Sequence, residues 1–66
     1  MNRHIIPLSR PASPCGGLLS LEFLARKLAR FGESEALITL LTLSIPMSAR
    51  VRWTLYGNAL TVEVAA

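Results

Sequence analysis

The stretch from Arg50 to Ala65, RVRWTLYGNALTVEVA, most constrains how this 66-residue chain can fold. Gly57 and Asn58 accept positive φ angles, and β-branched and aromatic residues flank them on both sides. The pattern therefore predicts a β-hairpin that turns at this pair. Its alignment collects apolar side chains on one face: Leu55 opposite Leu60, Trp53 opposite Val62, and Val51 opposite Val64.

The same alignment collects the polar side chains of the hairpin on its other face. The pairs there are Tyr56 opposite Ala59, Thr54 opposite Thr61, and Arg52 opposite Glu63. A shift of one residue would exchange the two faces, so the alignment is strongly specified. Because the face of Trp53 is otherwise aliphatic, we expect its ring in the core.

A helical pattern covers Leu18–Phe31, where apolar residues recur at helical spacing. Gly32 follows as a residue that ends helices well, and Arg30 complements the negative end of the helix dipole. On the charged face, Glu22 and Arg26 are spaced for a favourable ion pair. The pattern predicts one amphipathic helix over residues 18–31.

The segment Ala36–Ile45, ALITLLTLSI, is ambiguous between strand and helix. Its β-branched residues favour a strand, whereas polar residues at helical spacing and a candidate cap at Ser34 favour a helix. We predict a strand that pairs with Arg50–Tyr56. One helix covers one face of a sheet, so this prediction leaves aliphatic side chains uncovered near Arg52 and Tyr56: Ala36, Ile38 and Leu40.

The predicted fold class is α+β, with one amphipathic helix packed on a three- to four-stranded antiparallel sheet that ends in the C-terminal β-hairpin. Residues 1–66 form a single small domain. It consists of an extended arm over 1–17 with a candidate edge strand at His4–Leu8, the helix over 18–31, and an antiparallel β-meander over 36–65. Two helices plus the hairpin are the alternative.

Composition narrows the functional classes. The chain is 52% hydrophobic and 17% charged, with a net charge of +3 and arginine as six of its seven basic residues. One cysteine and one histidine exclude an internal disulfide and a zinc site. Because a small apolar chain without such crosslinks has too little core of its own, we expect it to bury apolar surface against a protein partner or a second copy. No apolar run reaches the roughly 20 residues of a membrane span. We expect a cytoplasmic protein.

No catalytic, metal or cofactor pattern is present. Cys15 and His4 are the one candidate nucleophile and base, but no aspartate exists to orient the imidazole. Gly16 and Gly17 precede the helix without the Lys-Ser/Thr of a phosphate-binding loop. Carboxylate clusters for hard metals are missing. We expect no enzyme, no cofactor and no small-molecule substrate.

Two routes to nucleic-acid binding are open to a chain of this kind, a recognition helix and a strand face. A helix-turn-helix is disfavoured by its candidate recognition helix, the segment ALITLLTL after Gly32. This segment has no Arg, Lys, Asn or Gln, the side chains that read base edges. A strand face is more suitable, since Arg50, Arg52 and Tyr56 lie on one side of the hairpin. Basic residues interleaved with an aromatic are typical of sheets that bind nucleic acid.

The sequence therefore favours a small non-enzymatic interaction protein that occludes a protein partner, or its own copy, through an apolar surface edged by arginines. We expect an inhibitor of the kind that phages and mobile elements encode. A nucleic-acid-binding module that uses the Arg50, Arg52 and Tyr56 face is the alternative. The candidate contacts are Leu19, Phe23, Arg26 and Arg30 on the helix, with Arg50, Arg52 and Tyr56 on the sheet.

Overall fold

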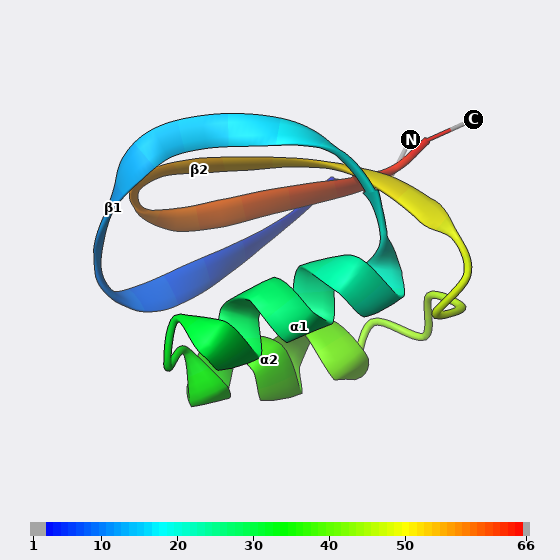
Figure 1. The fold of residues 1–66 in the computed structure, drawn as a ribbon, viewed down its shortest axis with the longest axis horizontal. Coiled ribbons are helices and arrows are strands. Elements are labelled where there is room, and N and C mark those ends of the chain that lie inside the picture. The colour runs from blue at the N-terminus through cyan, green and yellow to red at the C-terminus, as the bar shows by residue number, and fades with distance from the viewer. Residues whose placement is uncertain (1–2, 66) are drawn as a thin grey trace.

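A computed structural model describes residues 3–65 of the chain (Figure 1). Two strands enclose two helices along the sequence: β1 (Arg3–Ser20), α1 (Leu21–Arg30), α2 (Ser34–Leu41) and β2 (Arg50–Val64). The strands form one antiparallel sheet, and both helices lie on the same side of it. The molecule is thus a helical layer under a sheet.

Both strands bend, because neither can run straight within the molecule. The 15 residues of β2 would extend about 50 Å at the usual strand rise, whereas the longest dimension of the chain is 29 Å. β2 turns at Gly57, which has a φ of 58°. Beyond the turn, the Ala65 N–H donates to the Arg50 carbonyl oxygen at 2.9 Å. That bond lies in the alignment predicted for the hairpin.

The pairing between the strands places β2 in the middle of the sheet. The start of β1 pairs with the end of β2, from Arg3 opposite Glu63 to Pro7 opposite Ala59. After two register shifts, the end of β1 pairs with the start of β2, from Cys15 opposite Leu55 to Ser20 opposite Arg50. Residues 3–7 therefore form one edge of the sheet, here called the first edge, and residues 15–20 form the second edge (Figure 1).

The inner face of the sheet packs against the helices. Alternate residues of β2 are buried there, and Trp53 is 6% exposed within this core. The sorting of apolar from polar side chains predicted for the hairpin is confirmed except at Val64, which is exposed, and the core position of Trp53 is confirmed. The buried core consists of Ile6, Leu8, Leu21, Leu24, Ala25, Leu28, Ala36, Leu40, Val51, Trp53, Leu55, Leu60 and Val62.

The predicted amphipathic helix is present as α1, which begins three residues later than the sequence pattern indicates. Ser20 is extended and its hydroxyl accepts the Phe23 N–H at 3.4 Å, so this serine caps the helix. At the other end, Gly32 has a φ of 76°, and the Glu33 N–H donates to the Leu28 carbonyl oxygen at 3.0 Å. This is a Schellman-type ending.

The predicted three- to four-stranded sheet with one helix is wrong, although the α+β class holds. The sheet contains two strands, and most of Ala36–Ile45 belongs to α2 rather than to a strand. Helical spacing lets Ala36 and Leu40 enter the core together, which outweighs the strand preference of the β-branched residues. The alternative of two helices plus the hairpin matches α1, α2 and the turn within β2, but it lacks β1.

Candidate interaction surface

The outer face of the sheet, which points away from the helices, brings together three of the predicted contact residues. Arg50, Arg52 and Tyr56 are exposed at alternate positions of β2, while their neighbours are buried on the inner face. Tyr56 is 72% exposed. The local strand geometry therefore presents these side chains to solvent on one surface.

The β1 strand extends this surface on both sides. Arg3 lies opposite Glu63, Ile5 opposite Thr61, and Leu18 opposite Arg52. Ile5 is 68% exposed and Leu18 is 43% exposed. A shallow hollow of about 290 Å³ on this face is lined by Arg3, Arg52, Thr54, Thr61 and Glu63.

The outer face carries an excess of positive charge, from Arg3, Arg50 and Arg52 against Glu63. The charged residues Arg52 and Glu63, which the sequence places opposite each other, form no ion pair within residues 3–65. The ion pair observed in that range joins Arg26 to Glu22 at 2.9 Å. The predicted Glu22–Arg26 pair is thereby confirmed. Arginines without an ion-pair partner on the outer face leave planar donors for carboxylates or phosphates.

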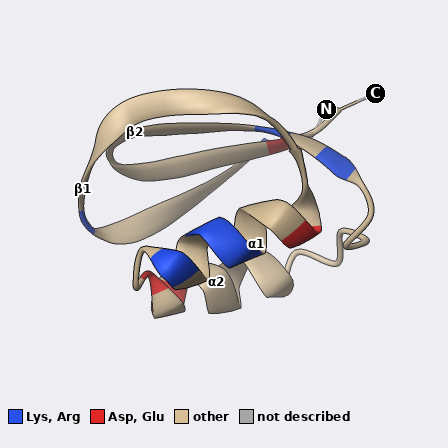
Figure 2. Ribbon diagram, viewed as in Figure 1, with Lys and Arg blue, Asp and Glu red and all other residues tan. Residues whose placement is uncertain are grey.

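The predicted helix contacts lie on a different surface. Phe23 is 55% exposed on α1, and the Arg26 guanidinium lies 5.6 Å from the centroid of its ring. Arg30 is exposed in the last turn of the same helix, whose basic positions are coloured blue in Figure 2. Because the helices cover the inner face of the sheet, this group is separated from the arginines of the outer face. Leu19 belongs to neither group, since it lies in β1 opposite Val51 and packs partly against the core.

The uncovered aliphatic surface predicted beside Arg52 and Tyr56 is also misplaced. Ala36 and Leu40 are buried in the core, and Ile38 is exposed on α2, in the helical layer. The apolar side chains that actually accompany the arginines of the outer face come from β1. Sequence reasoning missed Arg3, Ile5 and Leu18 because their places depend on pairing between the two ends of the chain. The opposite charges of Arg3 and Glu63 were the one available signal.

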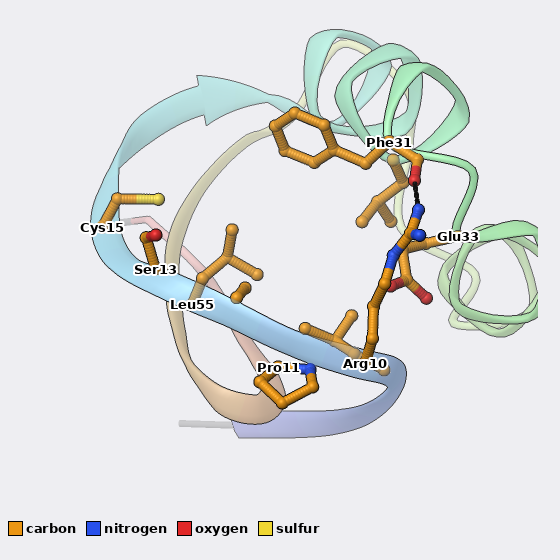
Figure 3. A pocket seen from close by; sticks show the side chains of 10 residues that line it. Arg10, Pro11, Ser13, Cys15, Phe31, Glu33 and Leu55 are labelled. Carbon is orange, nitrogen blue, oxygen red and sulfur yellow. Dashed lines mark hydrogen bonds between the residues drawn. The ribbon is translucent and has the colours of Figure 1, made fainter.

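A second hollow, of about 310 Å³, lies where β1 bends over the turn between the helices (Figure 3). There the residue Glu33 is 6% exposed, and its carboxylate accepts both the backbone N–H and the hydroxyl of Ser9, each at 2.9 Å. The hydrogen bonds from Ser9 hold the pKa of Glu33 below its ordinary value, and the positive charge of Arg10 acts in the same direction. Arg10 also donates to the Phe31 carbonyl oxygen at 2.7 Å. These contacts fasten the bend of β1 to the helical layer.

The two candidate catalytic residues are not brought together. Cys15 lies on the second edge opposite Leu55, and His4 lies on the first edge opposite Val62. The hairpin of β2 therefore separates the thiol from the imidazole. Within residues 3–65, no three His, Cys, Asp or Glu side chains gather as metal ligands do. No helix in that range has the length and apolar character needed to span a membrane.

Comparisons with protein families, curated proteins and solved structures found no match to this chain. The functional argument therefore depends on the geometry and charge of its own surfaces.

Proposed function

We propose that this chain is a small non-enzymatic interaction protein that binds an acidic protein partner through the outer face of its sheet. The observation that carries this proposal is the grouping of three arginines with exposed apolar side chains on that one face. Arg3, Arg50 and Arg52 have no ion-pair partner in the part of the chain that is described.

The composition of the outer face suits a protein interface. Tyrosine and arginine are the residues most often found at the energetic centre of such interfaces, where apolar anchors are surrounded by polar contacts. Here Tyr56, Leu18 and Ile5 supply apolar area, and the arginines supply paired donors to carboxylates. Binding acts by occlusion, since it masks the partner's surface without a covalent step. We place this activity in the cytoplasm, where a free, exposed Cys15 thiol stays reduced.

The test compares two double variants that remove the same charge from opposite surfaces. Arg50→Ala/Arg52→Ala alters the outer face, and Arg26→Ala/Arg30→Ala alters the solvent side of α1. We expect a lysate of the source cells to yield a protein retained by the immobilised wild-type chain and by the helix variant. Retention by the sheet variant should fall by about 10-fold or more, as for the loss of charged hydrogen bonds worth about 1.5–3 kcal/mol. Equal retention by the two variants would refute the proposal.

A nucleic-acid-binding module is the second candidate, favoured by the position of Arg3 next to the hollow that Arg52 also lines. Three phosphate contacts to single-stranded DNA predict a slope of about −2 in log affinity against log salt concentration. An oligothymidine should then lose about 20-fold in affinity between roughly 50 and 200 mM salt. Fluorescence anisotropy measures this loss, and the absence of oligothymidine binding at about 50 mM salt would exclude this candidate.

A further inference from the structure

The second edge of the sheet, residues 15–20, has an unusually open backbone. Residues 3–8 of β1 and 50–56 of β2 alternate between more buried and more exposed side chains, whereas Ser13–Leu18 are exposed at six consecutive positions. In Figure 1 this segment follows the outside of the fold, with no other segment beyond it on that side. The described backbone hydrogen bonds outside the strands and helices involve no residue of 15–20. Its outward amides and carbonyls are thus available to another strand.

This edge also lacks the usual defences against strand addition. Natural sheets block their edges with charged side chains, prolines or very short strands. The first edge carries Arg3 and Pro7, but the second edge, CGGLLS, has neither charge nor proline. Gly16 and Gly17 leave its backbone without side-chain cover. An extended peptide can therefore add to this edge by main-chain hydrogen bonding.

The charges beside the second edge indicate which peptide fits. On the outer face, Leu18 lies next to Arg52 and Ser20 lies next to Arg50. A strand added at this edge would lie about 10 Å from β2, two strand spacings away. An arginine and a glutamate that extend toward each other span that distance. Outward acidic residues on the added strand would neutralise both arginines.

We infer that the partner binds as an extended acidic segment that adds a strand to the second edge, with its carboxylates beside Arg50 and Arg52. This inference rests on the proposed function and specifies the form in which the partner binds. A second copy of the chain fits less well, because its own second edge carries no acidic side chain.

The test titrates the ¹⁵N-labelled full chain with a capped peptide, acetyl-Glu-Val-Glu-Thr-Glu-Val-amide. We expect the amide signals of Gly16 and Gly17 to shift and hydrogen exchange to slow within residues 15–20. A peptide with lysine in place of glutamate should bind about 10-fold more weakly or worse. Two further peptides carry N-methyl groups at odd or at even positions. At least one of them should lose binding, because strand addition uses alternate amides.

Protein variants complete the design. Arg50→Ala/Arg52→Ala should weaken binding of the glutamate peptide about 10-fold, while Arg26→Ala/Arg30→Ala should leave it unchanged. Both pairs are exposed, so the comparison does not depend on altered folding.

The remaining outcomes overturn the inference in distinguishable ways. If both methylated peptides bind as well as the parent and the shifts centre on Tyr56, the outer face binds acidic chains but the edge does not. The proposed function then stands without strand addition.

If the lysine peptide binds equally well, the inference that the added segment is acidic is wrong. Light scattering that shows a dimer abolished by Leu18→Lys but not by Ile5→Lys would assign the edge to a second copy. No peptide binding, together with equal retention of the partner by both double variants, would reject the function as well.

Discussion

The two edges of the sheet are formed by the same strand and flank the same hairpin, yet they are held in different ways. The first edge sends Ile6 into the core at 1% exposure, with Leu8 buried just beyond it. The chain then reaches Ser9, whose two hydrogen bonds to Glu33 fix it to the helical layer. Side chains therefore hold this part of β1 in place.

The second edge is held mainly through its backbone. A Cβ atom added to Gly17 would lie 3.6 Å from Trp53 Nε1, so the glycine itself packs on the indole ring. The Lys27 ammonium lies 5.4 Å from the centroid of that ring. Leu19 is the partly buried apolar side chain that this edge packs against the core. The difference indicates that buried side chains anchor the first edge, whereas the second edge is held by close backbone packing and by Leu19.

Alanine substitutions at one apolar residue of each edge test this division most strongly. Ile6→Ala removes a fully buried side chain and should lower the free energy of unfolding by about 2–5 kcal/mol. That is a large part of the total unfolding free energy of a small domain. Leu18→Ala removes a half-exposed side chain and should cost less than about 1 kcal/mol. Urea unfolding followed by circular dichroism measures both. Similar costs at the two positions would mean that the second edge is structural too.

The two adjacent glycines of the second edge give the next largest contrast. A Cβ atom at Gly16 would lie 2.8 Å from the Trp53 carbonyl oxygen, and backbone must move to relieve it. Gly16→Ala should therefore cost about 1–3 kcal/mol. At Gly17 the added atom makes ordinary contacts, so Gly17→Ala should change stability by less than about 1 kcal/mol. Thermal unfolding of the two variants gives their stabilities. A loss at Gly16 alone would come from the close backbone contact there, whereas equal losses would mean that both positions need the flexibility of glycine.

Local sequence patterns predicted the elements whose partners are near in the chain. The hairpin was predictable because its turn residues and alternation lie within one 15-residue stretch. The start of α1 was not, since the apolar helical spacing continues back to Leu18, although Ser20 was available as a cap. Segment 36–45 was misassigned because strand propensity was weighed without knowing that Ala36 and Leu40 would be buried together.

The candidate surface divides in the same way. Arg50, Arg52 and Tyr56 follow from alternation along one strand and were predictable. Arg3 and Leu18 join them through pairing across most of the chain, which no local pattern encodes. The prolines and glycines of residues 9–17 indicated a loop or an extended arm, and the chain there continues as β1, whose pairing partners the sequence did not reveal. An open edge was therefore outside the reach of sequence reasoning.

The smallest expected effect concerns the Glu33 carboxylate, which fastens the bend of β1 that follows the first edge. Because Ser9 holds the pKa of Glu33 below its ordinary value of 4.5, the ionised carboxylate stabilises the fold above that pH. This stabilisation is lost as the pH falls from about 4.5 through the lowered value of the folded state. The urea midpoint of the wild-type chain should therefore exceed that of Glu33→Gln at about pH 7, and the two midpoints should converge as the pH falls below the lowered pKa of the folded state.

Glu35→Gln, which removes an exposed carboxylate from the first turn of α2, is the matched control and should follow the wild-type profile. Amide exchange locates the effect. In the Glu33→Gln variant, the amides of Ser9 and of the first edge should exchange faster with solvent. The reason is that the hydrogen bonds from Ser9 to residue 33, which hold β1 to the helical layer, are weakened. The amides of Gly16 and Gly17 should exchange as in the wild-type chain. Equal loss of protection on both edges would show that they open together, and the functional division between them would then fail.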